Sequence, residues 1–147
     1  MGTGFVLIAY FIQAGNLTVT SVLISIPVGI LVGGINMANN IRDIEEDTKG
    51  GRRTLAILLG RDKAVLSLAL AFVISYLWIV VLIFIGSISP WALVVLLSLK
   101  KPISAIKGFK KGEKEPQFMR VAMKSTAITN TIFSFLLSIG LLISYLF

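Results

Sequence analysis

The chain contains no cysteine and no histidine. The absence of cysteine excludes a disulfide framework, a thiolate metal site and a cysteine nucleophile. The absence of histidine excludes a Ser-His-Asp triad and removes the commonest transition-metal ligand. A G-x-x-x-x-G-K-[ST] loop is also missing, which argues against a nucleoside triphosphatase. Carboxylates, amides, hydroxyls, Lys and Arg remain for chemistry, and this set suits Mg²⁺ and phosphate better than zinc.

Charge is scarce as well. Only 14% of the 147 residues are charged, 56% are hydrophobic and the mean hydropathy is +0.91. Soluble domains carry roughly a quarter of charged residues, so the composition indicates an integral membrane protein. The 14 Lys and Arg and the 7 Asp and Glu all fall in residues 42–63 or 100–124. The net charge of +7 therefore indicates anionic lipid headgroups and an anionic substrate rather than nucleic acid.

The segments between the charged windows predict an all-α, multi-spanning helical bundle. A charge in hydrocarbon costs about 2.5 to 3.5 kcal/mol, which explains why these segments carry none. Residues 4–14 are too short to cross a membrane core of about 30 Å. Full spans are predicted at 17–38, 64–85 and 125–147, a short tilted helix at 91–106, a polar loop at 39–63 and a basic loop at 108–116.

The lysines and arginines also predict a topology. Both charged windows lie on one side if residues 64–106 run out and back, and the uncharged turns at residues 15–16 and 86–89 then lie on the other. Cytoplasmic loops carry an excess of Lys and Arg. We therefore expect a multi-pass protein of the cell membrane with loops 42–63 and 100–124 in the cytoplasm.

The first full span contains several residues that disfavour soluble helices, among them Pro27, Gly29 and Gly33. Membrane helices tolerate them because neighbouring helices satisfy the freed backbone groups. Gly29 and Gly33 share a face, which favours close packing of a second helix. A kink that directs the following polar residues into a cavity is the alternative.

Polar side chains follow this span at helical spacing. On a continuous helix Asn36, Asn40, Asp43 and Asp47 lie within about 40° of one line, whereas Glu45 points the other way. Two carboxylates this close repel each other unless a cation lies between them or each is solvated separately. The face indicates either a Mg²⁺ site that takes bridging phosphates or a solvated helix end on which acids and bases compensate each other.

Basic residues surround these acids. Arg52 and Arg53 follow the pair Gly50-Gly51, which breaks the helix, and Thr54 is a predicted N-cap for a short apolar turn over residues 55–59. Arginine forks bind phosphate oxygens in a bidentate manner, so a flexible loop could bring two of them to a diphosphate. Anchoring at the membrane surface is the alternative for Arg42, Lys49, Arg52 and Arg53.

Residues 39–64, NNIRDIEEDTKGGRRTLAILLGRDKA, resemble the second aspartate-rich motif of the UbiA-type membrane prenyltransferases. They are most similar to the 1,4-dihydroxy-2-naphthoate prenyltransferases of menaquinone synthesis, with the pattern N-N-x-R-D-x-x-x-D…G-[KR]-x-T-L-A…L-G. The flanking segments 12–34 and 119–140 are similar to that group too, so the resemblance covers most of the chain.

The resemblance implies a bundle of nine membrane helices in which Mg²⁺ joins a prenyl diphosphate to two acidic motifs. It implies that Asp43 and Asp47 are the catalytic, magnesium-binding residues and that Asn39 and Asn40 are the adjoining amides. The helical face favours Asn40 over Asn39 as the further metal ligand. We expect the diphosphate to be bound by Asn40, Arg42, Lys49 and Arg53.

Members of the family carry a first motif of the form N-x-x-x-D-x-x-x-D, and this sequence has none before Asn36. We therefore expect the chain to be the C-terminal portion of one prenyltransferase domain, inactive unless paired with the missing half. The reaction implied is transfer of a polyprenyl group from its diphosphate to an aromatic acceptor, with 1,4-dihydroxy-2-naphthoate preferred over 4-hydroxybenzoate, haem or a glycerol phosphate. A non-catalytic membrane subunit or transporter-like protein with a structural cation site is the alternative.

Overall fold

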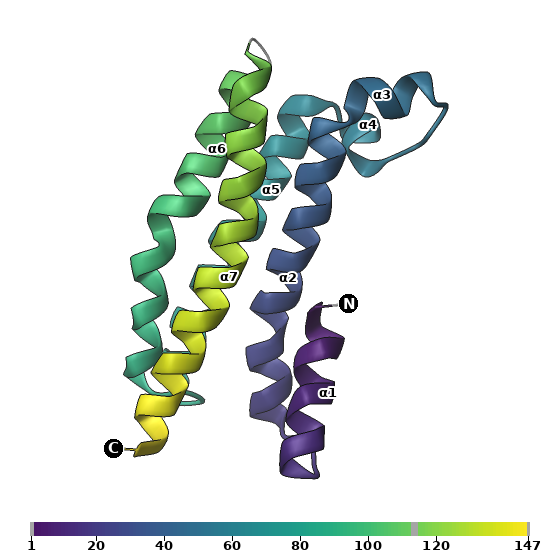
Figure 1. Cartoon of the computed structure of the whole chain (residues 1–147). Coiled ribbons are helices and arrows are strands. Elements are labelled where there is room, and N and C mark those ends of the chain that lie inside the picture. Colours follow the sequence, from purple (N-terminus) through teal and green to yellow (C-terminus); the bar gives the residue numbers. More distant parts are fainter. Residues whose placement is uncertain (1, 113–114, 147) are drawn as a thin grey trace.

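The protein is a bundle of long helices in a computed structural model that describes residues 2–112 and 115–146 (Figure 1). Those residues form helices and connections without a strand, so the prediction of an all-α fold is confirmed. The elements in chain order are α1 (Gly2–Ala14), α2 (Val19–Arg42), α3 (Ile44–Lys49), α4 (Leu55–Leu59), α5 (Arg61–Phe84), the 3₁₀ helix η1 (Pro90–Leu99), α6 (Lys100–Gly112) and α7 (Pro116–Leu146).

Three helices in the described part are long and apolar enough to cross a membrane: α2, α5 and the stretch Gln117–Leu146 of α7. α1 is apolar but has only 13 residues, which rise about 20 Å and fall short of a bilayer core of about 30 Å. The predicted full spans and the short first segment are confirmed, and the chain is a membrane protein by these helices.

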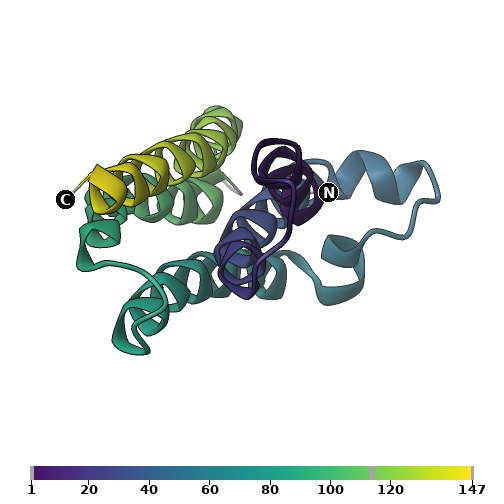
Figure 2. The same ribbon diagram turned by 90° about the horizontal axis from the view of Figure 1, so that it is seen from below.

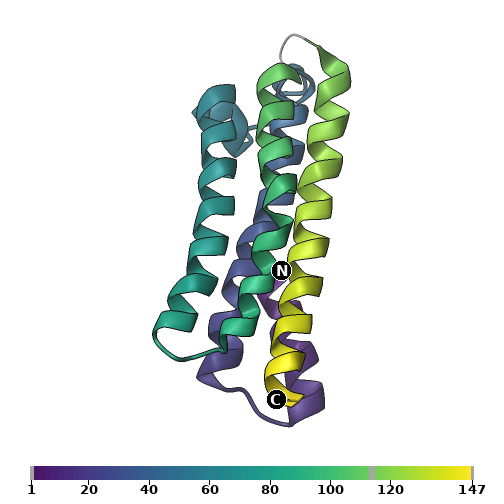
Figure 3. The ribbon, with the colours of Figure 1, turned by 90° about the vertical axis from the view of Figure 1, so that its left-hand side faces the viewer.

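The segment that follows the α5–η1 turn, residues 90–112, differs from its prediction. Instead of one tilted helix over residues 91–106, a 3₁₀ segment runs directly into α6, which continues to Gly112. The prediction of a basic loop over residues 108–116 was wrong for residues 108–112, because Gly108 is a packing residue and not a breaker; residues 113 and 114 lie outside the described residues. A Cβ on Gly108 would lie 2.9 Å from the Cβ of Ala122, so its small size lets α6 and α7 approach closely (Figure 3).

The charged segments gather at one end of the bundle. Figure 1 shows α3, α4, the last turn of α6 and the first turn of α7 at the end opposite the α1–α2 and α5–η1 turns. Viewed along the bundle, α2 lies between α5 and α7, and α1 packs on its outer side (Figure 2). The expected separation of charged and uncharged turns is therefore present in the fold.

The contact between α2 and α5 explains how Pro27 is accommodated inside a helix. Proline lacks an N–H, which leaves the carbonyl of Leu23, four residues earlier, without its helical donor. Nε1 of Trp78 on α5 donates a hydrogen bond to this carbonyl oxygen at 2.9 Å, and Oγ of Ser75 donates to the carbonyl of Pro27 at 3.4 Å. The neighbouring helix satisfies the freed backbone group, as the sequence analysis predicts.

Two glycines of α2 allow close packing, Gly29 against α1 and Gly34 against α5. A Cβ on Gly29 would lie 2.1 Å from Oγ1 of Thr3 on α1, and one on Gly34 would lie 3.2 Å from Leu68 on α5. Gly33 has no atom of the described residues within 4 Å of that position. Close packing is therefore confirmed for Gly29 and not for Gly33.

A buried tyrosine joins three elements at the other side of α5. The hydroxyl of Tyr76 lies 2.6 Å from Oγ of Ser98 on η1, and its ring meets that of Phe133 on α7 edge to face at 5.1 Å. Tyr76 is 5% exposed, so this polar contact is made inside the bundle. It holds η1 to α5 where helix packing is otherwise sparse.

Candidate diphosphate and metal site

The acidic residues lie where α2 ends and the chain turns. α2 ends at Arg42, and Asp43, with φ −96° and ψ 10°, is both the C-cap of α2 and the N-cap of α3. α3 leaves at an angle to α2 (Figure 1), so the prediction of one unbroken face from Asn36 to Asp47 was wrong beyond Asp43. The hydrogen bond from Asp47 N to Asp43 O, at 2.8 Å, keeps the two aspartates one turn apart despite this bend.

Asp43 is held by the residue that precedes it. Nε of Arg42 donates to Oδ1 at 2.6 Å and Nη2 donates to Oδ2 at 2.7 Å, which is a bidentate fork. The hydrogen bonds from Arg42 lower the pKa of the Asp43 carboxyl, and the charge of Arg52 acts in the same direction. The Arg42 side chain is 48% exposed, so this pair contributes at most about 1 kcal/mol to folding and can be exchanged for another partner at low cost.

Asp47 is the buried member of the pair, at 8% exposure. Its Oδ1 accepts a hydrogen bond at 3.1 Å from Nη1 of Arg52, whose own side chain is 76% exposed. The backbone brings Arg52 there: its N–H donates to the carbonyl of Asp47 at 2.9 Å, and Gly51, at φ +69°, makes the turn. The sequence places Arg52 among the basic residues around the acids, but Arg52 is not among the four residues expected to bind the diphosphate; the signal for its pairing was its place after a Gly-Gly turn, five residues beyond Asp47.

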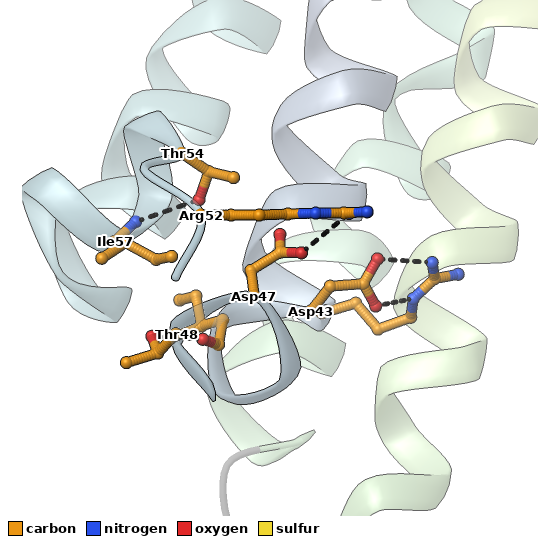
Figure 4. Close-up of polar contacts among 8 residues, drawn as sticks. Asp43, Asp47, Thr48, Arg52, Thr54 and Ile57 are labelled. Carbon is orange, nitrogen blue, oxygen red and sulfur yellow. Dashed lines mark hydrogen bonds and ion pairs between the residues drawn. The ribbon is translucent and has the colours of Figure 1, made fainter. Parts of the chain in front are cut away.

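Figure 4 shows the carboxylates of Asp43 and Asp47 directed toward the same side of the chain, with Arg52 extended across that side. Asp43 pairs with Arg42 and Asp47 pairs with Arg52. The structure therefore contains the arrangement given above as the alternative to a Mg²⁺ site, in which acids and bases compensate each other. Asn40 is half-buried on the same stretch of α2, whereas Asn36 is exposed. Lys49 and Arg53 are exposed.

The neighbouring residues agree with one smaller prediction. Oγ1 of Thr54 accepts a hydrogen bond from the N–H of Ile57 at 3.4 Å, which confirms it as the N-cap of α4. Glu45 has a side chain that is 81% exposed, and its Oε1 lies 3.7 Å from Nη2 of Arg61, an arginine that pairs with neither Asp43 nor Asp47. α4 and α5 thus follow directly from the acidic turn and fix its position on the bundle.

The donor set of this turn fits a hard cation in part. The described residues contain no group of three or more carboxylate, histidine or cysteine side chains close enough to hold a metal ion. Mg²⁺, however, usually takes only one or two carboxylates from a protein and completes its shell with water and substrate phosphates. Asp43 and Asp47 supply that number of carboxylates, and among the described residues their side-chain oxygens pair with arginines whose side chains are 48% and 76% exposed.

Comparison with known proteins gives concordant results. The model of the UbiA prenyltransferase family matches residues 1–128. A 1,4-dihydroxy-2-naphthoate octaprenyltransferase of Bacillus subtilis is 61% identical over 145 residues, which are 99% of this chain and 46% of that protein. A UbiA prenyltransferase domain-containing protein 1 homolog of Drosophila melanogaster is 31% identical over 131 residues, 89% of this chain and 35% of that protein.

A 1,4-dihydroxy-2-naphthoate octaprenyltransferase of Haemophilus influenzae is 39% identical over 54 residues, 37% of this chain and 18% of that protein. The chain thus spans less than half the length of these relatives. No solved structure matches the chain significantly. The family model covers most of its residues, and the chain belongs to the UbiA prenyltransferase family.

Proposed function

We propose that the chain supplies the diphosphate-binding part of a membrane enzyme that transfers a polyprenyl group from its diphosphate to an aromatic acceptor, with Mg²⁺ as the metal. The observation that carries the proposal is the pair of aspartates, Asp43 at the end of α2 and Asp47 one turn later, directed to one side and paired with arginines whose side chains are 48% and 76% exposed. Membership of the prenyltransferase family supports the reaction class.

The residues of the turn have distinct parts in this proposal. Asp43 and Asp47, with the half-buried Asn40, would hold the metal, which when bound would offset the negative charge that develops on the departing diphosphate. Arg42 would leave Asp43 when that carboxylate takes the metal, and its fork would then be free for phosphate oxygens. Arg52 would do the same from Asp47, and Lys49 and Arg53 would add positive charge around the leaving group.

The acceptor is proposed to be 1,4-dihydroxy-2-naphthoate. The name of the relative that is 61% identical over nearly all of this chain contains that substrate.

We further propose that the chain is the C-terminal portion of the enzyme domain, that its charged end faces the cytoplasm, and that a second acidic motif outside this sequence completes the site. On this proposal the chain alone should form little or no product when incubated with prenyl diphosphate, Mg²⁺ and the acceptor, and robust turnover would contradict it.

Binding tests the site directly. We expect geranyl diphosphate and Mg²⁺ together to raise the melting temperature of the chain in detergent, because ligand at a hundred times its Kd stabilises by about 2.7 kcal/mol. Asp43→Asn and Asp47→Asn should each remove most of this shift, whereas the control Glu45→Gln, which alters an exposed side chain that pairs with Arg61, should keep it. A shift with Mg²⁺ alone that the diphosphate does not increase would instead favour a structural cation site.

A further inference from the structure

A groove on the bundle lies outside the acidic turn. It lies between residues of α5 and α6 and consists of two adjoining hollows of about 490 Å³ and about 390 Å³. Ala69 and Ile106 line both hollows, so one groove leads from the middle of the bundle to its charged end. Neither hollow is lined by Asn40, Asp43 or Asp47.

The larger hollow is suited to a hydrocarbon chain. Its lining is almost entirely apolar and includes Phe72, Val73, Leu77 and Ile103. Three of these four, Val73, Leu77 and Ile103, are more than half exposed in the chain. Both helices bear apolar residues at this level, where a membrane presents acyl chains and no water.

The smaller hollow is cationic. Arg61, Asp62 and Lys110 line it, and Lys107 lies on the wall of the larger hollow next to it. Within the described residues, the buried Nη1 of Arg61 has no hydrogen-bond partner, and its Nη2 is 3.7 Å from Glu45, beyond hydrogen-bond distance. A buried guanidinium nitrogen without an acceptor is costly, so this end of the groove favours an anionic oxygen.

We propose that this groove binds an anionic glycerophospholipid, with one acyl chain in the larger hollow and the phosphate at Arg61, Lys107 and Lys110. The charge fits a phosphodiester: three cations, Arg61, Lys107 and Lys110, face two carboxylates, Asp62 in the lining and Glu45 at 3.7 Å from Arg61, which leaves one positive charge for a single negative charge without a metal. A prenyl diphosphate fits less well because this end lacks the paired carboxylates that hold a diphosphate through Mg²⁺. The inference is independent of the proposed function, since the two sites share no residue.

The headgroup contacts are tested by exchange of charge. The chain is purified in detergent with dioleoylphosphatidylglycerol or dioleoylphosphatidylcholine, and bound lipid is counted by native mass spectrometry. We expect retention of phosphatidylglycerol only. The double variant Lys107→Gln, Lys110→Gln should reduce its affinity roughly tenfold or more, because each basic residue near an anionic headgroup contributes substantially to binding.

The matched control is Arg120→Gln with Lys124→Gln, which removes the same charge from exposed residues of α7 that line neither hollow. Its affinity should change by less than about twofold if the groove is the site. Equal losses in both double variants, or equal retention of the two lipids, would overturn the proposal in favour of general attraction to the basic surface.

The acyl-chain contact is tested by filling the groove. Ala69→Phe places a ring where the two hollows join and should abolish retention of phosphatidylglycerol, with folding verified by an unchanged helical circular dichroism spectrum. If that spectrum changes, the smaller Ala69→Leu takes its place. Undiminished lipid binding in a folded Ala69 variant would overturn the proposal, as would displacement of the lipid by geranyl diphosphate.

Discussion

The seam between α2 and α5 and the acidic turn after α2 use polar groups in opposite ways. In the seam, the indole of Trp78 satisfies a carbonyl that Pro27 leaves without a donor, and apolar residues enclose the contact. In the turn, the aspartates pair with Arg42 and Arg52, whose side chains are 48% and 76% exposed. A seam contact has no substitute partner in a membrane, whereas water, metal or phosphate can replace the arginines of the turn.

This difference separates what stabilises the fold from what is available to a ligand. Breaking the seam should cost folding free energy and leave the chemistry of the turn intact. Changing the turn should remove function and cost little stability. Substitutions in the seam and in the turn test these two expectations separately.

The largest expected effect is on turnover. We propose to join the chain to a segment that carries the first acidic motif of the family and to measure prenyl transfer. Asp43→Asn or Asp47→Asn should lower kcat by at least about a hundredfold, a typical loss when a charge-stabilising group is removed. The free energy of unfolding should change by no more than about 0.5 kcal/mol for Asp43→Asn, and by about 1 kcal/mol for Asp47→Asn, whose buried carboxylate accepts a hydrogen bond from Arg52. Turnover equal to that of the Glu45→Gln control would remove both aspartates from the site.

Much of this contrast was predictable from the sequence. The segregation of charge predicted the membrane spans and the gathering of the charged segments at one end of the bundle. It did so because charged residues are costly in hydrocarbon and must therefore lie outside the spans. The bend at Asp43 was not predictable, since helical hydrogen bonds from Asp43 N to Asn39 O and from Asp47 N to Asp43 O continue through it, although Asp43 has φ −96° and ψ 10°. The Asp47–Arg52 pair depends on that bend and on the turn at Gly51, so it was missed as well.

The structure around Gly108 was not predictable from the sequence either. In sequence it stands among lysines and indicates a loop, and only the position of Ala122 on α7 makes it a contact residue. Tertiary packing decided the structure of this segment against its local preference. The same holds for η1, whose apolar run does not distinguish a 3₁₀ helix from an α-helix.

The next effect is on packing. Gly108→Leu should destabilise the chain by about 1 to 3 kcal/mol because the side chain has no room against α7. Gly33→Ala is the matched control: it also changes a helical glycine, but into open space, and should stabilise by about 0.5 to 1 kcal/mol through helix propensity. Titration with SDS, followed by circular dichroism, measures both. Equal effects at the two glycines would contradict the assignment of Gly108 to the helix contact.

A smaller effect is expected at the proline. Trp78→Phe should cost about 1 kcal/mol, since it leaves the Leu23 carbonyl without a donor. In a Pro27→Ala background residue 27 regains its N–H, which can donate to that carbonyl, so the same Trp78 change should cost less. A double-mutant cycle of unfolding free energies gives the difference. Additive effects would show that Trp78 contributes by packing alone.

The smallest effect concerns pH and the exposed pair of the turn. Because the hydrogen bonds from Arg42 lower the pKa of Asp43 in the folded chain, the pair stabilises the fold above the ordinary aspartate pKa of about 3.9 and loses that contribution as pH falls through the lower folded value. With EDTA present, the unfolding free energies of wild type and Asp43→Asn should therefore differ by a constant amount, about 0.5 kcal/mol or less, from pH 8 to pH 5. The difference should shrink below about pH 4. In an Arg42→Gln background most of this pH dependence should disappear, and its persistence there would mean that Arg42 does not set the ionisation of Asp43.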